Sequence, residues 1–211
     1  LRSLVGSEMC IRDRIMQKAL DGGVDRVLVG GVLGNVFLAA RDYRLGEPSI
    51  EFIRGKKFVD QIDVARQLLD RYPGRIVLPV DVAIDKAGVR VEVSVSQLPQ
   101  DYRIVDVGGQ TVQRYVGEIR SAGTVFFNGA LGVYENPVFA YGTEEVIRAI
   151  ASAKCFSVIG GGDTVAAARN LGVEDKITHV STGGKASIDY LAGVRMAAIE
   201  ALREAGGRVL V

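Results

Sequence analysis

The feature that most limits how this chain folds is its alternation of short β-branched runs with longer segments of helical periodicity. Most of the short runs are continuously apolar, which is typical of parallel strands buried on both faces. Residues 89–95 (VRVEVSV) alternate instead, so we expect an antiparallel excursion with one solvated face there. We expect buried strands at residues 25–29, 75–80, 103–107, 123–127, 155–159 and 177–180.

The segments between these runs predict helices at residues 32–41, 57–72, 110–121, 143–153, 163–171, 185–191 and 196–205. Repeated strand–helix alternation favours right-handed crossovers and a parallel sheet covered on both sides. The predicted fold class is therefore α/β, with a doubly wound, mainly parallel sheet of about six strands and helices on both faces, a Rossmann-like three-layer sandwich.

Composition and charge argue against several classes of function. The chain has 211 residues, of which 48% are hydrophobic and 24% charged, enough for a sizeable core. A formal net charge of +1 gives no electrostatic footprint for nucleic acid or an anionic membrane, and no apolar run approaches the length of about 18 residues that a membrane span needs. Cys10 and Cys155 form no metal or redox spacing, which favours a reducing cytoplasm.

The first fourteen residues do not share the periodicity of the rest. The string MCIRDR at positions 9–14 looks like the in-frame translation of a sequencing-adaptor oligonucleotide. We therefore expect residues 1–14 to be an artefact rather than native sequence, set them aside in the fold prediction, and assign the domain to residues 15–211.

Adjacent glycines follow most of the predicted strands, in the stretches VGGVLGN, VDVGGQT, IGGGDT and VSTGGKAS, and a further glycine loop, FNGALGVYEN, follows another. In a doubly wound sheet, ligands bind where strands deliver their carboxyl ends into loops. One glycine pair can simply make a sharp turn. Their recurrence at one sheet edge favours backbone lying close to a large ligand.

The usual nucleotide motifs are absent from these loops. Gly184-Lys185 lacks the preceding glycine and following hydroxyl of a phosphate-binding P-loop, and Val165 replaces the third small residue of a dinucleotide motif, which disfavours NAD. A helix N-terminus with free amides remains after Gly161. Asp163 there either complements the helix dipole or holds Mg²⁺ against nucleotide phosphates. His179, inside an apolar run, is expected to be buried and structural.

Several stretches, taken in order, resemble phosphoglycerate kinases: VDRVLVGGVLGNVFLAA, RYPGRIVLPVDVAI, RIVDVGGQT, GTVFFNGALGVYENPVFAYGTEEV, VIGGGDTVAA and ITHVSTGGKASIDYLAG. The resemblance covers residues 15–202 and is nearer to archaeal members of the family. It implies the C-terminal, nucleotide-binding half of a two-domain kinase, truncated at its N-terminus. The implied reaction is phosphoryl transfer between ATP and 3-phosphoglycerate, with Mg²⁺, in a protein that is a monomer when whole.

The resemblance also implies site residues. Around the nucleotide it places Gly30 and Gly31 beside the adenine with Val105, Asn128 near the phosphates, Glu135 at the ribose hydroxyls, and Gly160, Gly161, Gly162 and Thr164 along the phosphates. Asp163 is implied as the metal residue. The amides of Gly183 and Gly184 are implied to face the phosphoryl group in transit, as catalytic groups.

Three positions depart from the family pattern. Lys185 stands where a third glycine is usual, Ala130 replaces a proline, and Val32 replaces a glycine. The family's catalytic lysine segment and its phosphoglycerate-binding half have no counterpart in the sequence. We therefore expect this chain to bind ADP or ATP without turning over. The alternatives are a binding module for another phosphorylated ligand and an incompletely folded fragment.

Overall fold

The structure is a computed structural model that describes residues 2–6, 15–191 and 193–208. Its larger sheet has six strands in the order β3-β2-β1-β7-β8-β9, all paired in parallel. The strands are β1 (Arg2–Gly6), β2 (Arg26–Val29), β3 (Ile76–Val77), β7 (Thr124–Asn128), β8 (Phe156–Gly160) and β9 (His179–Ser181). The chain winds outward in one direction through β1, β2 and β3 and in the other through β7, β8 and β9. The predicted doubly wound α/β fold is confirmed.

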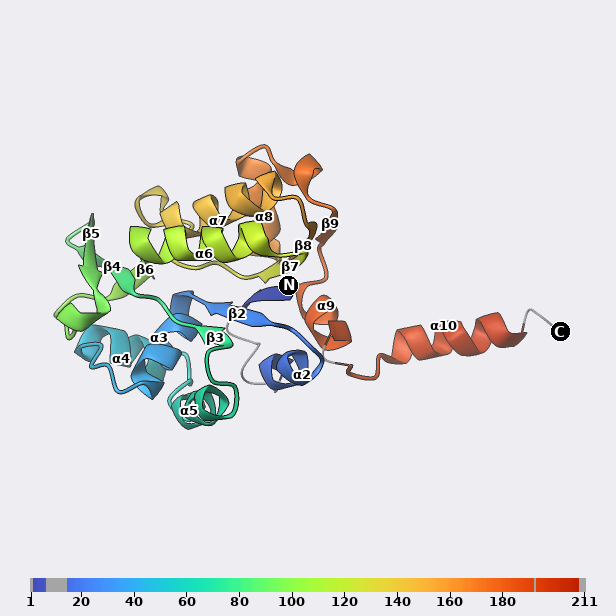
Figure 1. Cartoon of the computed structure of the whole chain (residues 1–211), viewed down its shortest axis with the longest axis horizontal. Helices are drawn as coiled ribbons and strands as arrows, with labels where there is room; N and C mark the ends of the chain where they lie inside the picture. Colours follow the sequence, from blue (N-terminus) through green and yellow to red (C-terminus); the bar gives the residue numbers. More distant parts are fainter. Residues whose placement is uncertain (1, 7–14, 192, 209–211) are drawn as a thin grey trace.

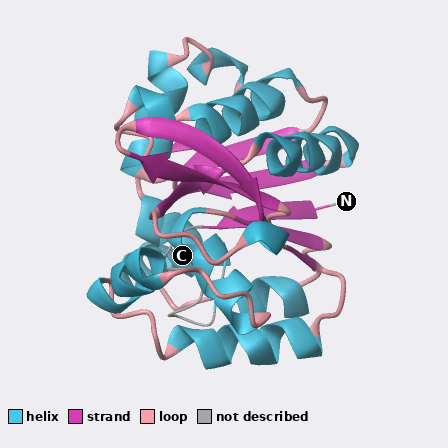
Figure 2. Cartoon of the chain, turned by 90° about the vertical axis from the view of Figure 1, so that its left-hand side faces the viewer, coloured by secondary structure: helices cyan, strands magenta, loops and turns pink. Residues whose placement is uncertain are grey.

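Helices cover both faces of this sheet. Their bounds in the described part of the chain are α2 (Ile15–Asp21), α3 (Gly31–Ala40), α4 (Glu47–Gly55), α5 (Gln61–Arg71), α6 (Gly109–Ser121), α7 (Tyr141–Ser152), α8 (Gly162–Asn170), α9 (Gly184–Leu191) and α10 (Ala197–Arg208). Figure 1 shows α6, α7 and α8 on one face and α2, α3 and α5 on the other, with α10 projecting away from the body. Seen from the side, the strands lie between two helical layers (Figure 2).

Two hydrophobic clusters, one on each face, explain why the strands read as continuous apolar runs. In β7, Phe126 joins the cluster that contains Phe37 of α3, while its neighbour Phe127 joins the cluster that contains Tyr115 of α6. Successive side chains of a strand point to opposite faces, so a strand covered on both sides needs an apolar residue at every position. Among the described residues, no helix has the length and apolar character that crossing a membrane would take.

A smaller antiparallel sheet of β4 (Asp81–Lys86), β5 (Val89–Ser94) and β6 (Ile104–Val107) lies beside the larger one, in the order β5-β4-β6. The antiparallel excursion predicted at residues 89–95 is therefore confirmed as β5. The prediction that residues 103–107 belong to the parallel sheet is wrong, because β6 pairs with β4 in the antiparallel direction. All four residues of β6 are buried, and burial on both faces gives the same apolar pattern in either sheet.

Three further predictions differ from the structure. Residues 2–6, which the fold prediction left out, form β1 and pair with β2 and β7, so the predicted sheet lacked a strand. The assignment of residues 1–14 to an artefact stays a prediction, and the string at 9–14 and Cys10 lie outside the described residues. The helix predicted from residue 57 begins at Gln61, and α4 was not predicted at all. His179 is exposed rather than buried, because β9 is the edge strand of the sheet.

Candidate functional site

A cavity of about 750 Å³ lies at the carboxyl edge of the parallel sheet, next to the point where the strand order reverses. The loops after β2, β7 and β8 line it, together with β6 of the smaller sheet. Most of the predicted site residues line this one cavity: Gly30, Gly31, Val105, Asn128, Glu135, Gly161, Gly162, Asp163, Thr164 and Gly184. Gly160 and Gly183 are not among its lining residues.

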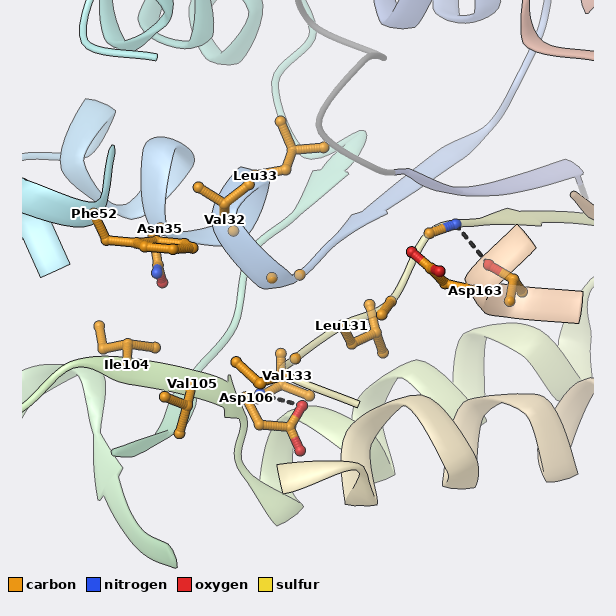
Figure 3. Close-up of a pocket in the computed structure, with 18 of the residues that line it drawn as sticks. Val32, Leu33, Asn35, Phe52, Ile104, Val105, Asp106, Leu131, Val133 and Asp163 are labelled. Atoms are coloured by element: carbon orange, nitrogen blue, oxygen red, sulfur yellow. Dashed lines mark hydrogen bonds between the residues drawn. The ribbon is translucent and has the colours of Figure 1, made fainter. Parts of the chain in front are cut away.

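The cavity has an apolar end and a glycine-rich end. Figure 3 shows Val32, Leu33 and Phe52 on the side away from Asp163, with Ile104 and Val105 below them. Two cationic side chains stand over the Phe52 ring: Arg103 Cζ is 4.8 Å and Lys56 Nζ 5.7 Å from its centroid. Such contacts hold a cation by the quadrupole of the ring. They place both cations at the apolar end.

The Gly30–Gly31 pair is required by the packing of a neighbouring loop. A Cβ on Gly30 would lie 2.4 Å from Leu131 Cδ2, which is closer than such atoms approach. Gly31 has φ of 59°, and its N–H donates to the Leu131 carbonyl at 2.8 Å. The bare backbone therefore lets the loop after β7 lie directly against the start of α3, so that both form one wall of the cavity.

The two other glycine loops pack against each other at the opposite end. A Cβ on Gly184 would lie 2.8 Å from Gly161 Cα, and one on Gly160 would lie 2.9 Å from Asn128 Nδ2. Gly161 itself has φ of 91°, a conformation that favours glycine. The β8–α8 and β9–α9 turns thus meet backbone to backbone beside Asn128. The first helical residue of α8, Gly162, faces the cavity there.

Asp163 and Thr164, adjacent in the first turn of α8, have different surroundings. Asp163 is exposed and lines the cavity. Thr164 is buried, and its Oγ1 accepts the N–H of Gly129 at 2.8 Å, which ties α8 to the end of β7. Burial, followed by the negative charges of Asp163 and Glu135, raises the pKa of Tyr134. Both carboxylates therefore act on the same stretch of the cavity rim.

The donor set at Asp163 fits a divalent cation only if another molecule completes the coordination. No group of three or more His, Cys, Asp or Glu side chains among the described residues is arranged to hold a metal. Mg²⁺ is commonly bound by one or two carboxylates together with substrate phosphates and water. A single exposed carboxylate beside a helix N-terminus matches that arrangement, and a metal held by protein groups alone does not.

The side wall of the cavity is built by β6 and the loop that follows β7. Val133 N–H donates to the Val105 carbonyl at 2.8 Å, which holds the loop against the strand. Glu135, two residues further, is exposed and lines the cavity. Behind this wall, Asp106 is buried, and its Oδ2 accepts the N–H of Gly142 at the start of α7 at 2.8 Å.

One of the glycine pairs, Gly108–Gly109, does not contact the cavity and serves another purpose. Gly108 and Gly109 begin α6 but do not line the cavity. The carboxylate of Asp81, from β4, accepts the N–H groups of Gln110 at 2.9 Å and Thr111 at 2.7 Å. A Cβ on Gly108 would lie 2.3 Å from Asp81 Cγ. The N-terminus of α6 is therefore occupied by a carboxylate of the chain itself.

Sequence reasoning missed several residues that line the cavity: Asn35, Phe52, Lys56, Arg103, Asp106, Leu131 and Val133. Phe52 and Lys56 come from α4 and its C-terminal end, which was not predicted. Leu131 and Val133 lie inside the glycine loop FNGALGVYEN, which was a usable signal. The side chain of Lys185 lies outside the described part of the chain.

The sheet order and the glycine-lined cavity define the class: a doubly wound α/β protein with a ligand cavity at the switch point of its sheet. The sequence model of one family, phosphoglycerate kinase, matches residues 9–194. The chain belongs to the phosphoglycerate kinase family, which confirms the predicted resemblance.

Individual relatives agree with this assignment. The chain is 46% identical over 198 residues to the phosphoglycerate kinase of Methanopyrus kandleri, covering 93% of this chain and 49% of that protein. It is 44% identical over 191 residues to that of Methanothermobacter thermautotrophicus, covering 90% and 46%. The crystal structure of phosphoglycerate kinase from Pyrococcus horikoshii superposes with a TM-score of 0.88 at 35% identity, over 96% of this chain and 51% of that one. The chain thus spans about half the length of the relatives it matches.

Proposed function

We propose that this chain binds the nucleotide of a phosphoglycerate kinase, as ADP or ATP with Mg²⁺, in the cavity at the switch point. The single observation that carries the proposal is the polarity of that cavity. Apolar side chains form one end, and helix-start backbone with an exposed carboxylate forms the other. A base suits the first environment, and phosphates suit the second, since helix N-termini favour anions.

In this proposal each part of the nucleotide has a named partner. The base lies between the Gly30–Gly31 turn and Val105, and Glu135 accepts hydrogen bonds from the ribose hydroxyls. The phosphates lie along Gly161, Gly162 and the N-terminus of α8, near Asn128. The Thr164 hydroxyl, which already accepts the Gly129 N–H, keeps its own O–H as a donor toward a phosphate oxygen.

Asp163 is the residue that would hold Mg²⁺. The cation, when bound, neutralises phosphate charge, and without it a carboxylate beside the phosphates would repel them. The chain's own part in phosphoryl transfer is then to fix the phosphates in line and to present backbone amides of Gly183 and Gly184 to the transferring group. Positioning and fixed dipoles of this kind account for most of the catalysis in phosphoryl transfer.

We also propose that the reaction of the family, phosphoryl transfer between ATP and 3-phosphoglycerate, needs groups beyond this cavity. Among the lining residues whose side chains are described, the cations are Lys56 and Arg103, both beside Phe52 at the apolar end. Neither stands where a second phosphorylated substrate would face the γ-phosphate. A coupled assay of the chain alone, with ATP and 3-phosphoglycerate, should give no turnover above the rate without protein; measurable turnover contradicts this part.

Isothermal titration tests the nucleotide proposal. The wild-type chain should bind ADP more tightly with Mg²⁺ than with EDTA, and Asp163→Ala should abolish that difference. The matched control is Asp63→Ala, which removes an exposed acid from the first turn of α5, away from the cavity. Absence of binding by the folded wild type would sink the proposal.

The second candidate is a binding module for another phosphorylated ligand. The observation in its favour is that Asp163 is the sole acidic residue in the first turn of α8, where it complements the helix dipole without any metal. In that case Asp163→Ala leaves affinity for ADP unchanged or improves it, with or without Mg²⁺.

A further inference from the structure

The buried carboxylate of Asp106 lies behind the side wall of the cavity and connects three segments of the chain. Its Oδ2 accepts the Gly142 N–H and a hydrogen bond from Arg90 Nη1, both at 2.8 Å. Its Oδ1 accepts the N–H of Val107 at 2.9 Å. β5, β6 and the N-terminus of α7 therefore meet at this one side chain.

The carboxylate does not face the cavity as a ligand. The exposed fraction of its side chain is 0%, and that of Arg90 is 15%. Figure 3 shows the carboxylate turned away from Asn35 and Phe52. The loop after β7 is fitted to it closely, because a Cβ on Gly132 would lie 2.5 Å from Asp106 Oδ1. Asp106 thus supports the cavity wall from the side that does not face the cavity.

We propose that Asp106 is a positioning residue, whose ionised carboxylate holds the loop from Gly129 to Glu135 and the start of α7 in the shape that accepts the nucleotide. The inference rests on the proposed nucleotide function of the cavity. Its physical basis is that ionised acceptors form stronger hydrogen bonds to N–H donors than neutral ones do. The carboxylate at the N-terminus of α7 also complements the helix dipole.

The surroundings of Asp106 make this device sensitive to pH. Burial raises the pKa of Asp106 to about 6, although the Gly142 N–H and the charge of Arg90 act in the opposite direction. The charged group in contact with Asp106 is Arg90 on β5, and Arg90 in turn bonds Glu92 at 2.9 Å. The Tyr141 ring of α7 lies 5.1 Å from Arg90 Cζ. Protonation below pH 6 removes the negative charge that Arg90 Nη1 contacts, so that Glu92 remains as the charged partner of Arg90, and it weakens the hydrogen bond from the Gly142 N–H.

Thermodynamic linkage then fixes the sign of the effect. If the ionised form shapes the cavity, nucleotide binds that form more tightly, so affinity falls as pH decreases through the pKa of Asp106. By reciprocity, bound nucleotide lowers the pKa of Asp106. A merely structural role predicts neither result.

The test compares the affinity of the wild-type chain and Asp106→Asn for MgADP by isothermal titration at pH 8 and pH 5. Because both proteins meet the same ligand, protonation of ADP cancels in the ratio of the two dissociation constants. We expect Asp106→Asn to bind roughly fivefold more weakly at pH 8, and the ratio to fall below about two at pH 5. Asp85→Asn, in the same small sheet but away from the cavity, should bind like the wild type at both pH values.

Equal affinity at pH 8, or a ratio that does not change with pH, overturns the role of Asp106. If the folded wild type binds no MgADP at either pH, the proposed function itself fails. A second measurement needs no variant: the Gly142 amide resonance of the wild type, titrated by NMR, should report a pKa near 6 that decreases with saturating MgADP. An unchanged pKa contradicts the inference.

Discussion

Replacing Tyr115 with phenylalanine should destabilise the chain through two strand ends at once. Tyr115 is fully buried in α6, and its hydroxyl donates to the Val29 carbonyl at 2.6 Å and to the Val77 carbonyl at 3.1 Å. These are the last residues of β2 and β3. Burial, the largest cause, raises the pKa of Tyr115, so the hydroxyl stays a donor across the working pH range.

The magnitude follows from what the substitution leaves behind. Phenylalanine fills nearly the same space, so the change removes the hydroxyl without a large cavity. Two buried carbonyls lose a shared donor, and an unsatisfied buried polar group costs about 1–3 kcal/mol. Because one hydroxyl serves both acceptors, we take about 2 kcal/mol as the expected loss of unfolding free energy.

Urea unfolding, followed by circular dichroism and by fluorescence, measures this loss. With a slope of about 2 kcal/mol per M, the unfolding midpoint should fall by about 1 M. Tyr190→Phe is the control, because the Tyr190 side chain is exposed and its loss should move the midpoint by less than about 0.25 M. A midpoint for Tyr115→Phe within that same margin of the wild type would refute the reasoning.

Three further substitutions test other parts of the structure. Gly184→Ala places a Cβ 2.8 Å from Gly161 Cα, so the two glycine turns must separate. The affinity for MgADP should then fall about tenfold in isothermal titration, and unchanged affinity contradicts the packing described. Gly117→Ala, on the exposed side of α6 with no atom within 4 Å, should raise the unfolding free energy by about 0.5–1 kcal/mol in urea, and a decrease would count against the helix geometry. Asp81→Ala removes the acceptor for two amides at the start of α6 and should cost about 2 kcal/mol, seen as a lower melting temperature; an unaltered melting temperature argues against the cap.

The parallel sheet was predictable wherever helices cover both of its faces. The runs that became β2, β7 and β8 are apolar at almost every position because each strand contributes to two hydrophobic clusters. Because β6 is also buried, its sequence does not distinguish it from the parallel strands, although it pairs with β4 in the antiparallel direction. β9 shows the opposite case, since an edge strand of three residues leaves His179 exposed despite its apolar neighbours.

The parts of the candidate site that were predictable from the sequence are those where a glycine is needed by the fold. Gly30 and Gly184 each stand where a Cβ would collide with a neighbouring segment, and Gly161 has a φ of 91° that favours glycine, so their presence in the sequence reflects the fold directly. Phe52 reaches the cavity from α4, whose short segment, beginning Glu47-Pro48, gave no distinct helical signal. The pair Gly108–Gly109 had the same appearance as the others, but only the structure shows that the distant Asp81 carboxylate accepts the N–H groups of the next two residues, Gln110 and Thr111.

The contacts between Asp81 and α6 also bear on motion. Thr111 Oγ1 donates to the Asp81 carbonyl at 2.9 Å and accepts the N–H of Val80 at 2.9 Å, while Gly108 N–H donates to the same carbonyl at 3.1 Å. These bonds fasten the small sheet to α6, a helix that packs on the large one. The two sheets should therefore tumble and fluctuate as one rigid unit, and opening of the cavity should be confined to its loops. Backbone order parameters from NMR relaxation should then be as high in β4 and β6 as in β7.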